Sequence, residues 1–276
     1  MTSDGRLPEA SRQGASARTA RDVSKPKKAD GVQKAEIGGG GGGETARNGS
    51  QRQPLQFRAK PVEPSAVLSI LASGKQTVNE RVLRFQAMRG MELSKEERES
   101  ALVFFAGKQV PDGMGKGSMQ WLADELLTVL RLQQPPWEGL AEEIAKVAFQ
   151  PGTDPVVRDY IMQHLGHLWE QYGARKEIDA ALWRAVETDD ETTPGTALIA
   201  LSRGYARDQD KKSQAAVHER ALALARNPDG TLAVRVTALS IAGDGGGAEV
   251  KELADRLTND ATTPVILRKV AERVGR

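Results

Sequence analysis

Gln150-Pro151-Gly152-Thr153-Asp154-Pro155-Val156-Val157-Arg158 aligns residue for residue with a later segment of the chain, Asn227-Pro228-Asp229-Gly230-Thr231-Leu232-Ala233-Val234-Arg235. After each segment, an apolar-periodic run closes on a glycine, Gly166 and Gly243, and these glycines are separated by the same distance along the chain as the two arginines. The offset corresponds to two units of about 38 or 39 residues, a period typical of solenoids. In such folds each unit buries its apolar face only by stacking on the next unit. The two segments therefore predict a repeat protein.

Helix-start signals recur along the chain from Pro64 onward. Asp154-Pro155, Thr193-Pro194 and Thr263-Pro264 each place a capping residue before a proline at the first helical position, where the missing N–H costs nothing. Ser94-Lys95-Glu96-Glu97 has the pattern of a capping box before an apolar run. These signals predict where individual helices begin.

Stepping along the chain by about 39 residues from Pro155 predicts one helix in each unit. These helices begin near positions 78, 118, 155, 194, 232 and 264. Their partner helices are predicted at about 65–73, 95–107, 138–149, 176–187, 212–226 and 247–258. No stretch shows the sustained period-two alternation of a strand. The sequence predicts an all-α protein, an α-solenoid of six antiparallel helix pairs.

The segment 1–63 differs in composition from the rest of the chain. It carries 12 Lys/Arg against 7 Asp/Glu, includes six consecutive glycines at 38–43, and contains few large apolar side chains. Such a segment buries too little surface to offset its backbone entropy. We predict a disordered basic tail over 1–63 and a helical repeat domain over 64–276, whose net charge is −3.

The repeated pattern resembles the second helix of HEAT repeats. The matching residues are Pro155-Val156-Val157-Arg158 with Leu165-Gly166, and Leu232-Ala233-Val234-Arg235 with Ala242-Gly243. The units that start at Pro194 and Pro264 keep the proline but shift the arginine or glycine by about one position. The resemblance implies an α-solenoid that binds proteins, and it carries no catalytic residues to transfer.

Composition excludes several kinds of chemistry. The chain has no cysteine, which rules out disulfides, thiolate nucleophiles and cysteine–zinc sites. No apolar run approaches the roughly 18 residues that span a bilayer, and the N-terminus leads into no apolar signal region. The expected location is the cytoplasm.

The few candidate chemical groups favour structural roles. His164 and His167 share one predicted helix, but Glu170 lies about 60° away from His167 and no third ligand joins them. Lys116, within Gly113-Met114-Gly115-Lys116-Gly117-Ser118, lacks the strand and the hydroxyl residue of a phosphate loop. We therefore expect no metal, no cofactor and no catalytic site.

The two equivalent arginines, Arg158 and Arg235, are expected to join neighbouring units by pairing with loop carboxylates such as Asp154. The glycines Gly166 and Gly243 are expected either to meet a neighbouring helix closely or to have a left-handed backbone.

Two tryptophans are the candidate partner-binding residues. Trp121 and Trp183 lie about 120–130° from the apolar centres of their helices. They are either exposed anchors on one groove or packing residues on helices that bury two faces.

The expected function is a non-enzymatic scaffold that binds another protein. One alternative is nucleic-acid binding, as in HEAT-like DNA glycosylases, which requires Lys and Arg to gather on one stripe. The mildly acidic body argues against it. The other alternative is a cofactor-attachment chaperone of the bilin lyase-like type.

Overall fold

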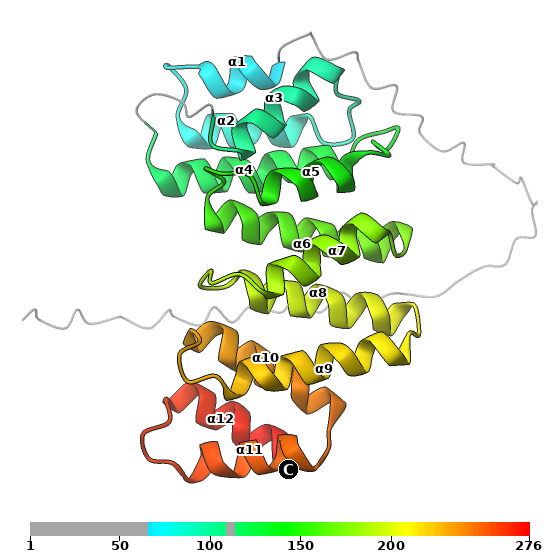
Figure 1. The fold of residues 1–276 in the computed structure, drawn as a ribbon. Helices are drawn as coiled ribbons and strands as arrows, with labels where there is room; N and C mark the ends of the chain where they lie inside the picture. Colours follow the sequence, from blue (N-terminus) through cyan, green and yellow to red (C-terminus); the bar gives the residue numbers. More distant parts are fainter. Residues whose placement is uncertain (1–65, 109–113) are drawn as a thin grey trace, which may run out of the picture. The chain divides into compact units, whose positions relative to one another are not determined.

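The computed structural model describes residues 66–108 and 114–276, all within one unit, Gln56–Arg276. The predicted tail, 1–63, lies outside these residues. The described part of the chain forms twelve helices and no strand, which confirms the all-α prediction (Figure 1). The helices are α1 (Ala66–Ala72), α2 (Val78–Ala87), α3 (Lys95–Phe105), α4 (Lys116–Arg131), α5 (Leu140–Ala148), α6 (Pro155–Tyr172), α7 (Lys176–Val186), α8 (Thr193–Arg207), α9 (Lys211–Arg226), α10 (Leu232–Gly245), α11 (Ala248–Asn259) and α12 (Val265–Val274). None of these described helices is long and apolar enough to cross a bilayer.

Local capping explains where many helices begin. Asp154 accepts a hydrogen bond from the Val156 N–H at 2.9 Å, and Pro155 opens α6 as predicted. The predicted capping box at Ser94 and Glu97 is present, because both reciprocal bonds form. A second capping box, Thr77 with Glu80, opens α2 and was not singled out from the sequence.

Two of the predicted helix starts need correction by one position. Thr193 belongs to α8 itself, so the N-cap is Thr192 and Pro194 is the second helical residue. Pro264 has φ −52° and ψ 138°, an extended conformation, so it caps α12 rather than opening it. In both cases the ring of proline suits either position, because its φ near −65° fits both the cap and the first turn.

The helices lie beside one another in chain order (Figure 1). Each even-numbered helix contacts the next even-numbered helix, from α2 to α12, and each odd-numbered helix contacts the even-numbered helix that follows it. Buried apolar side chains from α1 to α12 join in one cluster between these helices. The even-numbered helices therefore form a continuous layer.

An arginine occupies the same place in four of the six described even-numbered helices. Arg81, Arg158, Arg235 and Arg268 each lie one turn after the N-cap, in α2, α6, α10 and α12. The first three are evenly spaced along the chain, and each bonds a carbonyl at the end of the preceding helix, those of Leu71 (3.0 Å), Ala148 (2.7 Å) and Ala225 (3.4 Å). The last carbonyls of a helix lack intrahelical partners, so each of these guanidinium groups satisfies one of them.

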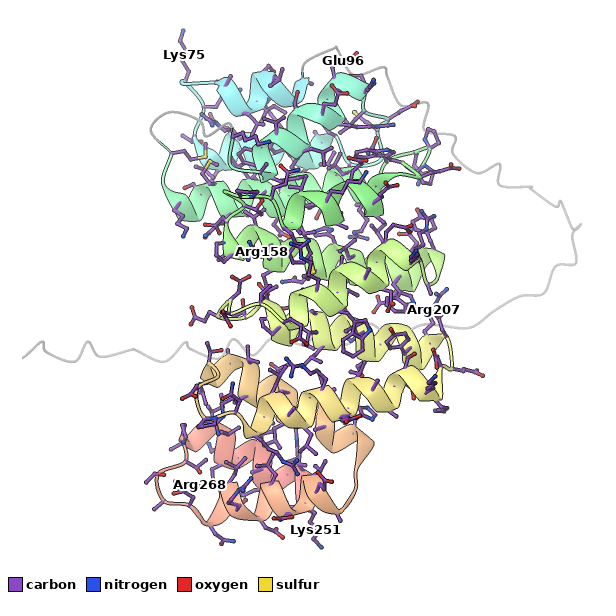
Figure 2. All side chains as sticks on the ribbon, in the orientation of Figure 1. Lys75, Glu96, Arg158, Arg207, Lys251 and Arg268 are labelled. Carbon is purple, nitrogen blue, oxygen red and sulfur yellow. The ribbon has the colours of Figure 1, made fainter. Side chains whose placement is uncertain are left out.

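The predicted carboxylate partners of these arginines need correction. Arg158 pairs with Asp190 at 2.5 Å, not with Asp154 (Arg158 is labelled in Figure 2). Asp154 instead receives Lys116 at 3.0 Å and caps α6. The partner of Arg235 among the described residues is the carbonyl of Ala225. Sequence spacing identified the equivalent arginines, but loop geometry decided which acceptor each one reaches.

The two repeat glycines lie at close helix contacts inside their helices. A Cβ on Gly166 of α6 would lie 3.0 Å from the Cβ of Ala200, and one on Gly243 would lie 2.7 Å from the Cγ2 of Val274. Neither has a positive φ, so close approach is the reason for glycine here. Gly204, one repeat unit after Gly166, is a third such position and faces the ring of Trp169.

Candidate protein-binding pocket

His164 and His167 do not form a chelating pair. His164 is 5% exposed, its Nδ1 accepts a hydrogen bond from Nε of Arg131 at 3.3 Å, and its Nε2 faces Oδ1 of Asp124 at 3.4 Å. His167 is exposed and lies 3.5 Å from the carboxylate of Glu170. Within residues 66–108 and 114–276, no three His, Asp or Glu side chains are grouped so that they could hold a metal ion.

Lys116 is engaged in an ion pair. Its Nζ lies 3.0 Å from Oδ2 of Asp154, while Gly113 of the glycine-rich segment lies outside the described residues. The ammonium therefore already has a carboxylate partner at the start of α6.

Trp183 is a packing residue rather than an exposed anchor, which corrects one of the two sequence interpretations. It is partly buried against the core, and its Nε1 donates to Oη of Tyr205 at 3.0 Å. The Tyr205 hydroxyl in turn donates to Asp179, and burial together with this carboxylate raises the pKa of Tyr205 to about 12. Helix α7 packs against α5, α6 and α8, so a helical wheel with one apolar face could not place this ring.

Trp121 fits the exposed one of the two interpretations that the sequence left open. Its ring is 46% exposed on α4. Helix α4 packs against α2, α3 and α6, whereas Trp183 lies on α7, so these contacts do not place the two rings on one groove.

We expect Trp183→Ala to lower the free energy of unfolding by about 2 kcal/mol, roughly half the cost of a fully buried tryptophan. Trp121→Ala is the matched control and should stay within about 0.5 kcal/mol of the parent. Urea denaturation of both variants measures the difference. Equal losses from the two substitutions would contradict the burial difference.

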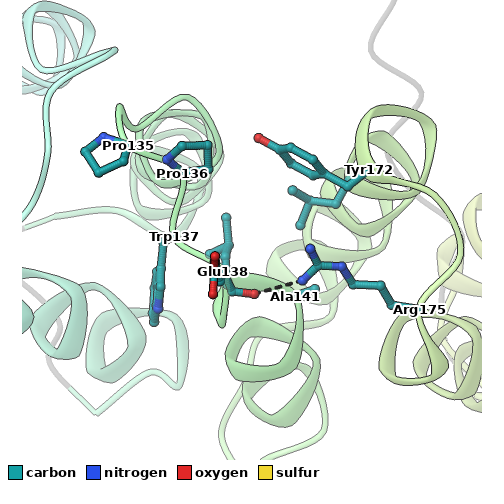
Figure 3. Close-up of a pocket in the computed structure, with 9 residues that line it drawn as sticks. Pro135, Pro136, Trp137, Glu138, Ala141, Tyr172 and Arg175 are labelled. Atoms are coloured by element: carbon teal, nitrogen blue, oxygen red, sulfur yellow. Dashed lines mark hydrogen bonds between the residues drawn. The ribbon is translucent and has the colours of Figure 1, made fainter.

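A pocket of about 290 Å³ lies where the α4–α5 loop meets the end of α6 (Figure 3). The residues that line it are Pro135, Pro136, Trp137, Glu138, Leu140, Ala141, Leu168, Tyr172 and Arg175. Figure 3 shows the two proline rings facing Tyr172 across the opening, with Arg175 on the same side as Tyr172. Its walls are therefore mostly rings and aliphatic groups, with one arginine and one glutamate.

Local sequence places each wall of the pocket. Pro135 and Pro136 follow α4 and prevent the helix from continuing. Gly173, with φ of 89°, ends α6 and turns the chain so that Arg175 returns to the pocket.

Arginine contacts hold the walls in place. One Nη of Arg175 donates to the carbonyl oxygen of Glu138 at 2.8 Å, and its Cζ lies 5.9 Å from the Tyr172 ring centre. On the other side, the guanidinium of Arg98 lies 5.2 Å from the Trp137 ring centre. Both aromatic rings therefore rest against a cation, an arrangement that fixes ring orientation.

The sequence analysis missed the pocket because one wall comes from the α4–α5 loop and the start of α5, and the other comes from the end of α6 and Arg175, more than 25 residues later along the chain. The run Pro135-Pro136-Trp137 between two predicted helices was the available signal, since aromatic residues in loops often bind partners.

Comparison with protein-family models, with curated proteins and with solved structures found no match for this chain. The resemblance to HEAT repeats stays a prediction from the quoted motifs, and the pocket geometry is the starting point for function.

Proposed function

We propose that this protein is a non-enzymatic scaffold, an α-solenoid of HEAT-like helix pairs, that binds another protein at the pocket of Figure 3. The single observation that carries the proposal is the open, ring-lined pocket with a fixed arginine on its wall. The continuous contacts of the even-numbered helices and the three evenly spaced, equivalent arginines support the repeat architecture.

The lining of the pocket favours a protein segment. Its volume of about 290 Å³ is near the lower bound for small-ligand sites, about 300 Å³, and accommodates one or two side chains. Tryptophan, tyrosine and arginine are also the residue types that contribute most to protein–protein affinity. Trp137, Tyr172 and Arg175 are all present here.

The partner segment is expected to combine an apolar side chain with an acceptor oxygen. The proline, tryptophan and leucine walls take up an apolar group. A guanidinium has five N–H donors, and the one bond to the Glu138 carbonyl leaves donors for a carbonyl or carboxylate of the partner.

The net charge of −3 over 64–276 argues against the nucleic-acid alternative, because a nucleic-acid surface needs clustered cations that reach phosphates. Arg158, whose side chain is 17% exposed, bonds to a carbonyl and a carboxylate of the protein itself (Arg158 is labelled in Figure 2). We therefore keep protein binding as the function that the geometry favours.

Tyr172→Ala and Arg175→Ala are each expected to weaken partner binding by at least about tenfold, because both side chains line the pocket. The partner is first identified by photo-crosslinking in the native host with p-benzoylphenylalanine at position 172. The same group at position 266, on the exposed face of α12, is the control for non-specific capture. Binding is then measured with the purified partner.

Ile266→Ala, which removes an exposed apolar side chain of α12, serves as the control and should retain parental affinity. The proposal is overturned if positions 172 and 266 capture the same proteins, or if folded Tyr172→Ala binds as tightly as the parent.

A further inference from the structure

We propose that His164 is an acid-sensitive latch that helps to hold together the two walls of the Figure 3 pocket, so that its protonation loosens the pocket. The effect of acid on partner binding rests on the proposed function, but the opening of the contact between His164 and Arg131 does not.

The position of His164 ties it to both walls. Helices α4 and α6 contact each other directly. Arg131 is the last residue of α4 and leads into the loop that carries Pro135 and Trp137. His164 lies one helical turn before Leu168, which lines the pocket from α6. The bond of 3.3 Å from Arg131 to His164 therefore joins the end of α4 to the middle of α6, one turn before the pocket residue Leu168.

This contact requires a neutral histidine. The guanidinium of Arg131 has N–H donors only, so Nδ1 of His164 must be the acceptor in this bond and carries no proton. The proton of the neutral ring is on Nε2, toward Asp124 at 3.4 Å. Protonation of Nδ1 would place an N–H donor of His164 against the Nε–H donor of Arg131. It would also bring two positive charges together at a residue that is only 5% exposed. Such a contact cannot persist, since neither donor is satisfied and the charges repel.

Charged groups on several helices surround the latch. Burial lowers the pKa of His164 below its usual value of 6.5, and Arg131 and His167 act in the same direction, while Asp124 opposes them. Asp124 is partly exposed, so solvent screens it. Arg89, at the end of α2, acts on Arg131 in turn.

The ring centre of His167 lies 6.2 Å from that of His164; His167 also faces Glu170 and shares a groove with Arg203 of α8.

The sign of the effect follows from this lowered pKa. Above pH 6.5 the ring is neutral in both folded and unfolded chains, and the latch is closed. As the pH falls below 6.5, the unfolded chain binds the proton first, so the latch's contribution to stability decreases. Once the pH passes through the folded pKa, the ring protonates in place and the latch opens.

The chain contains no cysteine, so a distance across the pocket can be measured cleanly. Gln134 and Ala174 are exposed and lie beside the two walls. The double variant Gln134→Cys/Ala174→Cys, made in the full chain, carries two nitroxide labels. Electron–electron resonance then gives the distance distribution at pH about 7.5 and at a lower pH at which the NMR signals of the His164 ring show that it is protonated.

We expect the distribution to broaden and shift by about 1–2 Å at the lower pH, the size of helix shifts at packed interfaces. With His164→Asn added, which keeps an acceptor near Nδ1 but does not titrate, the distribution should be the same at both pH values. His218→Gln, on α9, replaces a histidine outside this cluster and should leave the pH response intact.

Arg131→Gln provides a second variant should His164→Asn fail to fold. It removes the guanidinium and should give the broad distribution at both pH values. The latch is disproved if the parent distribution does not change between the two pH values, or if His164→Asn shows the same change. The distance measurement uses no partner. If it contradicts the latch, the binding test at Tyr172 is unaffected. If the binding test fails, the pH response of the latch can still be measured.

Discussion

Trp169→Ala is expected to lower the free energy of unfolding by about 3–5 kcal/mol, the largest loss of any single substitution considered for this protein. The ring of Trp169 is 0% exposed. It packs edge-on against Tyr205 of α8 at 5.0 Å between ring centres, and its Nε1 donates to Oδ2 of Asp208 at 2.7 Å. Alanine would therefore remove packing and a hydrogen bond at the contact between α6 and α8.

Gly204 makes room for this ring, because a Cβ there would lie 2.5 Å from the nearest ring atom. The space beside Gly204 accommodates a large side chain from α6. In the alanine variant the neighbouring helices can therefore close only part of the cavity that the missing ring leaves. Urea denaturation followed by far-UV circular dichroism gives the loss. Trp169→Phe keeps an aromatic ring and should lose clearly less than the alanine variant. A loss below about 1 kcal/mol for Trp169→Ala would contradict the described packing.

Arg158→Met is expected to cost about 2–3 kcal/mol of stability, somewhat less than the loss for breaking a fully buried ion pair. The side chains of Arg158 and Asp190 are 17% and 15% exposed. Methionine would leave the Asp190 carboxylate and the Ala148 carbonyl without the guanidinium that now bonds both. Ala148 is the last residue of α5 and Asp190 lies between α7 and α8, so one side chain of α6 joins two helix pairs.

Lys146→Met is the matched control. Its ion pairs with Glu142 and Glu143 lie on the exposed face of α5, where such pairs contribute little. Its stability should stay within about 0.5 kcal/mol of the parent. If Arg158→Met lowers the free energy of unfolding no more than Lys146→Met in the same denaturation experiment, then Arg158 does not hold neighbouring helix pairs together.

Local sequence was sufficient for the helices because helix formation depends on neighbouring residues. Asp154 before Pro155 and the capping box at Ser94 satisfy backbone N–H groups within a single turn. The apolar period of about 3.6 residues then shows which face each helix buries. Periodicity also located Arg158 and Arg235 as equivalent positions, although Arg81, the third member, was missed.

The pocket and the role of Trp183 could not be predicted in this way. The ring of Trp183 contacts Tyr205, 22 residues later, and the wall residue Arg175 bonds Glu138, 37 residues earlier. A helical wheel describes one helix with one buried face, whereas α7 is packed against three other helices.

The sequence by itself determined that this is an all-α chain, where most of its helices begin, and which positions recur at a constant spacing. Caps, prolines and apolar spacing act over a single helix turn and need no distant partner. The tertiary structure alone decided which rings are exposed, which acceptor each arginine reaches and where a pocket opens. These features depend on how far two packed helices approach each other, and that distance is set by side chains such as Gly166 and Ala200 on different helices.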